Sequence, residues 1–152
     1  MKHARLPLVL AGAVVLALGL TACEKPNPGA SVYSGTHSEF RRALCWTQEG
    51  VYLDETNCAS DLMKNAATGP DVAMIPTVAG QTIGISVDPV VADTGWYPVL
   101  NGTPLTKTPL TTTYFRFSPT QEQLTADGST LAIAAANDTG TRGVWFFQLV
   151  PA

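Results

Sequence analysis

After residue 30 the chain consists of short stretches in which apolar and polar residues alternate, the pattern of half-buried β-strands. The clearest case is 82–87, where Ile or Val occupies every second position. The last stretch, 143–150, is apolar on both sides, which indicates a strand in the middle of a sheet. Strands are predicted over 31–36, 41–47, 71–76, 82–87, 96–100, 111–117, 131–135 and 143–150.

Turn-forming residues separate these stretches. Asn101-Gly102 is the strongest short signal for a β-hairpin, because both residue types accept positive φ. Asn137 to Gly140 predicts a second turn. Only 59–67 has helical character, with polar residues at its start and an apolar side of Leu and Met. Seven or eight short strands with at most one short helix predict an all-β fold, an antiparallel β-sandwich.

The first 22 residues follow a different pattern. A basic start precedes a run over 6–20 without a charged side chain. This run is shorter than the ~20 residues that cross a bilayer and is typical of a secretory signal peptide. It ends in Leu20-Thr21-Ala22-Cys23, which resembles the lipobox of bacterial prolipoproteins. The resemblance implies that Cys23 carries a diacylglycerol and becomes the first residue after cleavage; an ordinary signal peptide with a chance cysteine is the alternative.

The sequence therefore predicts a signal peptide over 1–22, a lipidated cysteine with a flexible tether over 23–30, and a β-sandwich domain over 31–152. Two Pro and one Gly give the tether no reason to pack, and seven residues reach at most ~23 Å. We expect the domain outside the cytoplasm, held on the cell membrane by the lipid at Cys23.

The cysteines favour a disulfide. The chain has 3 Cys, and assigning Cys23 to the lipid leaves Cys45 and Cys58. Outside the cytoplasm such a pair predicts a disulfide, which stabilises the fold by ~3 kcal/mol for a loop of this length. A two-cysteine metal site is the alternative, but it lacks Cys-X-X-Cys spacing and a nearby histidine, so we predict no metal ion.

Charge excludes one class of partner. The chain has 9 basic and 12 acidic side chains, and removal of 1–22 takes away Lys2 and Arg5, so 7 − 12 = −5 remains. The charges are scattered, and no basic cluster indicates a nucleic-acid partner.

A set of segments extends over nearly the whole chain after residue 30: Ser34-Gly35-Thr36, Cys45-Trp46, the stretch 84–92, Gly95-Trp96, the stretch 113–117 and the stretch 141–145. Together they resemble a family of small actinobacterial lipoproteins. The resemblance implies an immunoglobulin-like β-sandwich in the cell envelope, and it supplies no catalytic residue, cofactor or assigned function. In this chain the two cysteines are close in sequence, so their bridge would pin a loop to the second strand instead of joining two facing sheets.

Two copies of Asp-Thr-Gly, beginning at Asp93 and at Asp138, are the strongest catalytic candidates. In aspartic proteases two such carboxylates share one proton. Here both triplets fall between predicted strands, where Asp and Gly form turns. We therefore predict no catalytic residue and no enzyme, and a small aspartate-dependent hydrolase is the alternative.

Other polar residues indicate no site by themselves. His37 is the only histidine after residue 22, and we predict that it lies in a surface loop because no nucleophile motif accompanies it. Asp54, Glu55 and Asp61 offer oxygen ligands for Ca²⁺ but lack the EF-hand spacing, which favours a solvated loop.

The remaining candidates are Tyr114 and Arg116, which share one side of the predicted strand 111–117, opposite Phe115 and Phe117. Tyr and Arg are typical anchors of binding interfaces, so this pair is the candidate binding surface; half-exposed sheet residues without a partner are the alternative. We predict a non-enzymatic binding or accessory role without a cofactor, with an envelope protein or glycan as partner. A lipoprotein that sequesters a small ligand in a pocket between the sheets is the second hypothesis.

Overall fold

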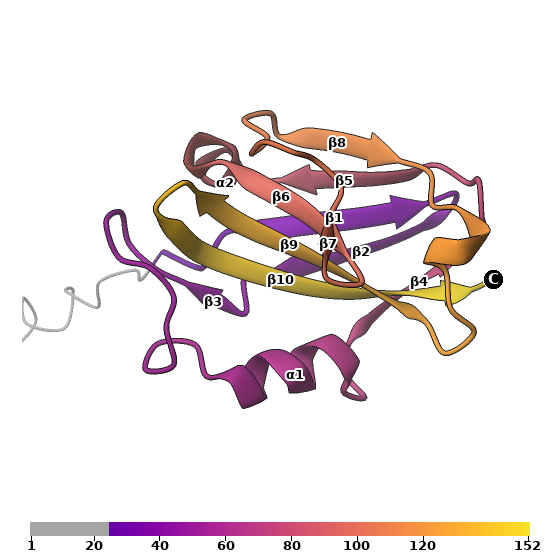
Figure 1. Cartoon of the computed structure of the whole chain (residues 1–152), viewed down its shortest axis with the longest axis horizontal. Helices are drawn as coiled ribbons and strands as arrows, with labels where there is room; N and C mark the ends of the chain where they lie inside the picture. Colours follow the sequence, from indigo (N-terminus) through magenta and orange to yellow (C-terminus); the bar gives the residue numbers. More distant parts are fainter. Residues whose placement is uncertain (1–24) are drawn as a thin grey trace, which may run out of the picture.

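The computed structural model describes residues 25–152, which form two β-sheets packed face to face (Figure 1). The predicted all-β sandwich is confirmed, whereas Cys23 and the predicted signal peptide lie outside the described residues. The strands are β1 (Gly29–Ser34), β2 (His37–Arg42), β3 (Cys45–Trp46), β4 (Ala73–Thr77), β5 (Ile83–Val87), β6 (Trp96–Leu100), β7 (Thr103–Pro104), β8 (Tyr114–Phe117), β9 (Ser129–Asn137) and β10 (Gly140–Pro151). The helices are α1 (Ser60–Thr68), α2 (Pro89–Thr94) and a 3-10 turn over Gln121–Gln123.

The strand order defines the two layers. The four-stranded sheet has the order β2-β1-β5-β8 and is antiparallel throughout. The six-stranded sheet has the order β3-β10-β9-β6-β7, and β4 joins it by pairing with β10 in parallel. β10 pairs with β3, β4 and β9, so the last strand is central, as its apolar sequence predicts.

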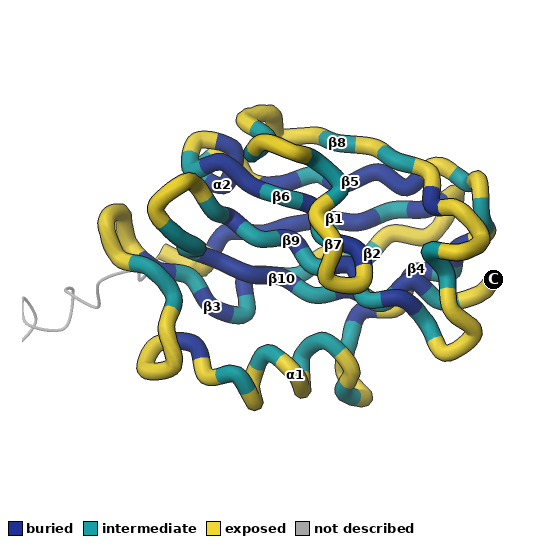
Figure 2. Tube along the Cα trace, viewed as in Figure 1, coloured by how far each residue is buried: buried dark blue, intermediate teal, exposed yellow. Residues whose placement is uncertain are grey.

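The core lies between the sheets, where the predicted inward faces of 82–87 and 131–135 meet. Ile83 and Ile85 come from one sheet, and Ile133 and Trp145 from the other, and all four are at most 1% exposed. Figure 2 shows that the buried segments follow the central strands, whereas the loops and the edge strands β7 and β8 are exposed or half-buried. Phe115 also points inward and meets Trp96 edge to face, but it is only half-buried because β8 is an edge strand.

A second cluster covers part of the outer face of the six-stranded sheet. The predicted disulfide between Cys45 and Cys58 is confirmed, with 5.8 Å between the Cα atoms. The disulfide packs with Val144 and Phe146 of β10 and with Met63 of α1. The predicted helix over 59–67 is confirmed as α1, which contacts β9 and β10.

The predicted tether over 23–30 is wrong at its end. Pro28, Gly29 and Ala30 are buried, and β1 begins at Gly29. The backbone explains the difference, since Gly29 N donates to Asp88 Oδ2 at 2.7 Å and Pro28 O accepts from the Trp145 indole at 3.1 Å. The fold therefore begins before residue 31.

The boundaries of the first two strands also differ from the prediction. Strand 31–36 ends two residues early, because Gly35 adopts φ +58° in a tight turn. The chain then continues as β2, so His37 begins a strand instead of lying in a loop. Strand 41–47 is divided between the end of β2 and the two residues of β3. Polar residues conceal β2 in the sequence because it is an edge strand with four of its six positions exposed.

Two features near the end of β5 complete the fold. Asp88 and Pro89 begin α2, a helix that the sequence analysis did not anticipate, although proline is favoured at the first helical position. The predicted Asn101-Gly102 hairpin is confirmed between β6 and β7, with φ of 49° and 80° at the two residues.

Candidate binding surface

The predicted surface residue Tyr114 is one half of a tyrosine pair. Its ring stacks on Tyr33 with 6.2 Å between the ring centroids and 7° between the planes. Tyr33 comes from β1 and Tyr114 from β8, so the pair spans β5 on the outer face of the four-stranded sheet. Tyr114 is 45% exposed. The pair thus offers aromatic surface to solvent.

Gly84 makes this pair possible. A Cβ at Gly84 would lie 2.2 Å from the Tyr33 ring, so the ring occupies the space that a side chain would need. Arg116 is the cross-strand neighbour of Gly84 and is exposed on the same face. The predicted residues Tyr114 and Arg116 therefore belong to one surface, together with Tyr33.

The same face extends to β2. Phe40 is 50% exposed, and the Arg42 guanidinium lies 5.7 Å from the centroid of its ring. Phe40 covers Gly29 of β1 as Tyr33 covers Gly84 of β5. Two aromatic side chains thus lie over glycines of this sheet, one on each of its two central strands.

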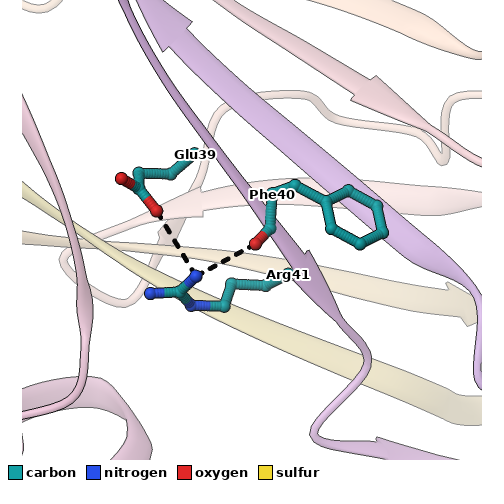
Figure 3. Close-up of polar contacts among 3 residues, drawn as sticks. All are labelled: Glu39, Phe40 and Arg41. Atoms are coloured by element: carbon teal, nitrogen blue, oxygen red, sulfur yellow. Dashed lines mark hydrogen bonds and ion pairs between the residues drawn. The ribbon is translucent and has the colours of Figure 1, made fainter.

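The opposite side of β2 carries charged side chains. Figure 3 shows Arg41 between Glu39 and the Phe40 carbonyl, with the Phe40 ring directed elsewhere. Arg41 Nη1 lies 3.3 Å from Glu39 Oε2 and donates to Phe40 O at 3.0 Å. Charged residues that point inward on an edge strand oppose pairing with another strand. β2 therefore presents Phe40 and Arg42 on one side and this ion pair on the other.

We call the outward side chains of the four-stranded sheet the aromatic face. Register and alternation assign to it Ser31, Tyr33, Ser38, Phe40, Arg42, Gly84, Ser86, Tyr114 and Arg116. These residues include two arginines. The next outward position after Ser86 is Asp88, at the end of this face, and its Oδ2 accepts from Gly29 N at 2.7 Å. The pKa of Tyr33 lies above its usual value, chiefly because its phenol shares a hydrogen bond with the Tyr114 side chain and secondarily because of burial. Tyr33 is therefore neutral at physiological pH.

A cavity of about 240 Å³ lies beside α1, at the edge of the sandwich. Its walls are mostly apolar and include Leu44, Ala66, Val72 and Phe146, with Trp145 at its base. Arg41 and Arg42 of β2 also line it. The cavity is therefore formed by α1 and by strands of both sheets, and it is small for a site that binds a drug-sized molecule.

The two Asp-Thr-Gly triplets lie in different elements. The second forms a turn, as predicted, whereas Asp93 and Thr94 of the first end α2 and Gly95 is its C-cap, so the predicted turn is wrong there. Asp93 and Asp138 are both exposed, and within residues 25–152 neither carboxylate has a hydrogen-bond or ion-pair partner. Thr94 Oγ1 donates to Val90 O and accepts from Arg142 at 3.1 Å, which joins α2 to β10.

The second triplet closes the β9–β10 hairpin. Asn137 Oδ1 accepts from the backbone N–H groups of Thr139 and Gly140, which is an Asx-type turn. The predicted turn from Asn137 to Gly140 is confirmed.

The acidic residues of the disulfide loop bind backbone and hydroxyl groups. Asp54 Oδ1 accepts from Thr56 Oγ1 at 2.6 Å and from the N–H groups of Thr56 and Asn57, which lowers the pKa of Asp54. Glu55 accepts from the Ser60 hydroxyl and N–H, which lowers the pKa of Glu55. No group of three or more His, Cys, Asp or Glu side chains in the described part of the chain is arranged to hold a metal ion. His37 is exposed at the start of β2.

Three members of the surface were not predicted from the sequence: Tyr33, Phe40 and Arg42. Tyr33 alternates with the buried Val32, so the period-2 pattern could have placed it beside Tyr114. Phe40 and Arg42 are two positions apart, but the polar residues around them hid the strand that gives them a common face.

No helix in the described range is long and apolar enough to cross a membrane. Comparison with protein-family models, with curated proteins and with solved structures finds no match. The resemblance to actinobacterial lipoproteins and the immunoglobulin-like character of the sandwich stay predictions.

Proposed function

We propose that this chain is a membrane-anchored lipoprotein on the extracytoplasmic face of the cell membrane, and that its sandwich is a non-enzymatic domain that binds an envelope partner through the aromatic face. One observation carries the proposal: the Tyr33–Tyr114 pair lies on an outer sheet face, with Tyr33 half-buried and Tyr114 45% exposed. Side chains that contribute little to the core are available for recognition, and Tyr and Arg are the residues that dominate interface energies.

The start of the fold supports a domain held close to the membrane. Asn27 is attached to the fold, because its carbonyl accepts from Arg42 Nη1 at 2.8 Å and its amide donates to Ala43 O at 3.3 Å. Three residues, 24–26, then separate Cys23 from the fold. At ~3.5 Å per residue such a segment reaches about 11 Å. A partner of this domain would therefore lie in the layer next to the membrane.

A photo-crosslinking amino acid at position 114 tests the binding surface in intact cells. Position 62 is the matched control, because Leu62 is 46% exposed and Tyr114 is 45% exposed, and Leu62 lies on α1. We expect one dominant adduct from position 114 that position 62 does not give. The same adducts from both positions, or none from position 114 in a chain that is membrane-bound, would contradict the proposal.

Anchoring is tested separately by replacing the cysteine of the lipobox. Cys23→Ser removes the thioether acceptor, so the variant should not incorporate labelled fatty acid and should remain as the uncleaved precursor. Cys58→Ser is the matched control and should be labelled like the wild type. Stable anchoring needs two acyl chains, so loss of the diacylglycerol should be visible as altered phase partitioning in detergent.

A second candidate function follows from the cavity beside α1. Its apolar walls and the indole of Trp145 fit a small apolar ligand, which corresponds to a lipoprotein that sequesters such a ligand. Ala66→Phe would fill the cavity. A ligand whose binding quenches tryptophan fluorescence in the wild type but not in this variant would support this function.

A further inference from the structure

We propose that the ligand of the aromatic face is an anionic glycan, a saccharide chain that bears carboxylate groups. This inference rests on the proposed binding role of the aromatic face and adds the chemical class of the ligand. It follows from the size of the face, from its chemistry and from its charge.

The size of the face favours a ligand smaller than a folded protein. Strands of up to six residues at ~3.3 Å per residue are about 20 Å long, and four strands at ~4.8 Å spacing are about 14 Å across. The aromatic face therefore covers roughly 300 Å², whereas a standard protein interface buries about 800 Å² of each partner. A single saccharide chain that crosses the strands fits this area.

The tyrosine pair supplies the stacking surface that a sugar ring needs. An aromatic ring has a negative face, and the C–H bonds on one side of a pyranose carry small positive charges that are attracted to it. Tyr33 and Tyr114 are held nearly parallel, at 7° to each other, so the two rings are oriented before a ligand arrives. Fixed aromatic side chains lose little conformational entropy on binding, which strengthens such weak contacts.

Hydroxyl and guanidinium groups surround the pair. Ser86 is the cross-strand neighbour of both Tyr114 and Ser31, so serine hydroxyls that can pair with sugar hydroxyls lie beside the rings. Arg116 follows Tyr114 by two positions on the same side of β8. A guanidinium binds a carboxylate through two parallel hydrogen bonds, and within the described residues Arg116 has no ion-pair partner.

Calorimetric titration of the lipidated chain in neutral detergent micelles tests this inference. The probes are an oligogalacturonate, the uncharged galactan oligosaccharide of the same length, and polyglutamate as a polyanion without sugar rings. We expect the oligogalacturonate to bind at least about tenfold more tightly than either other probe, because only it satisfies both the rings and the arginines. Equal binding of polyglutamate, equal binding of the neutral glycan, or no binding of the oligogalacturonate would overturn the inference.

Variants assign the binding to the aromatic face. Tyr114→Ala should weaken oligogalacturonate binding about tenfold, and Arg116→Gln should remove the preference over the neutral glycan. Leu62→Ala is the control with matched exposure and should bind like the wild type. Thermal unfolding of each variant shows whether the fold is retained, and unchanged binding by a folded Tyr114→Ala protein would overturn the assignment.

Two other outcomes separate this inference from the proposed function. If the crosslink from position 114 identifies one envelope protein, the proposed binding function is supported and the inference of a glycan ligand is wrong. The lipidated chain can also be placed in neutral vesicles and mixed with vesicles of anionic lipid. If it recruits the anionic vesicles and this recruitment depends on Tyr114, the face binds a membrane surface and the glycan inference is equally wrong.

Discussion

The two outer faces of the sandwich differ in whether their large side chains are covered by other parts of the chain. On the six-stranded sheet, Val144 and Phe146 lie beneath the disulfide and Met63 of α1. On the four-stranded sheet, Phe40 and Tyr114 remain about half exposed. Apolar burial stabilises a fold by ~25 cal/mol per Å², so an uncovered aromatic side chain contributes less than it could. Stability therefore accounts for the residues of the first face better than for those of the second.

Two glycines of the four-stranded sheet add to this difference between the faces. Tyr33 and Phe40 lie over Gly84 and Gly29, and a side chain at either glycine would collide with the ring above it. Each ring compensates for the poor strand propensity of the glycine beneath it. The glycine in turn leaves the space in which the ring is held. The aromatic face is thus ordered without being covered, which is the condition for a preformed binding surface.

The largest predicted effect concerns the covered face. Replacing both Cys45 and Cys58 with serine should lower the free energy of unfolding by ~3 kcal/mol, because the unfolded chain gains the entropy of an open loop. Urea unfolding measures the loss. The ring shifts of Tyr33 and Tyr114 in NMR spectra should not change in the folded variant. A shift at those rings would contradict the independence of the two faces.

The second prediction tests how α1 covers its sheet. Met63 packs on the disulfide cluster, whereas its neighbour Leu62 is exposed. Met63→Ala should lower the free energy of unfolding by about 1–2 kcal/mol, and Leu62→Ala by less than ~0.5 kcal/mol. Equal losses in urea unfolding would mean that α1 does not bury the side that the structure assigns to it.

The third prediction acts on the aromatic face. In Gly84→Ala the new Cβ would lie 2.2 Å from the Tyr33 ring, so the ring must turn away and the tyrosine pair must open. We expect a cost of about 1 kcal/mol and changed NMR shifts of the Tyr114 ring. Ser31→Ala, on the same face, is the control and should leave both rings in place. Unchanged Tyr114 shifts in Gly84→Ala would contradict the pairing.

Much of the fold could be predicted from the sequence, because alternation and turn residues are local signals. The inward faces of 82–87 and 131–135 and the central last strand follow from them, and the disulfide follows from the two cysteines that remain after Cys23. β2 could not be recognised in this way, since an edge strand needs few apolar residues. The parallel pairing of β4 with β10 joins segments about 75 positions apart, and no local pattern specifies such a partner.

The binding surface was predictable only in part, for a related reason. Tyr114 and Arg116 share one strand, so their common side is visible in the sequence. Tyr33 joins them only because β1 and β8 both pair with β5, and because Gly84 leaves space between them. A surface built across strands depends on strand order, which the sequence alone did not provide.

The smallest predicted effect is a response to acid that we expect in the disulfide loop and not on the aromatic face. Hydrogen bonds from the Thr56 side chain, and then from the Thr56 and Asn57 N–H groups, hold the pKa of Asp54 below its usual value of 3.8. A lowered pKa in the folded state means that the contribution to stability is present above 3.8 and is lost as the pH falls through the folded pKa.

As the pH falls below 3.8 the turn at Asp54 should therefore loosen. A lower protection factor of the Cys58 amide, which donates to Asp54 O, would report it once the exchange rate is compared with the intrinsic rate at each pH. Asp54→Asn cannot titrate, so the acid step should shrink in that variant to the part that Glu55 contributes through its hydrogen bonds with Ser60. The side-chain hydrogen bonds of Tyr33 go to Tyr114 and Ser86 and not to a carboxylate, so the Tyr33 and Tyr114 ring shifts should stay constant over the same range. Ring shifts that follow the Cys58 exchange rate would show that the disulfide loop and the aromatic face are coupled, against the separation that their packing indicates.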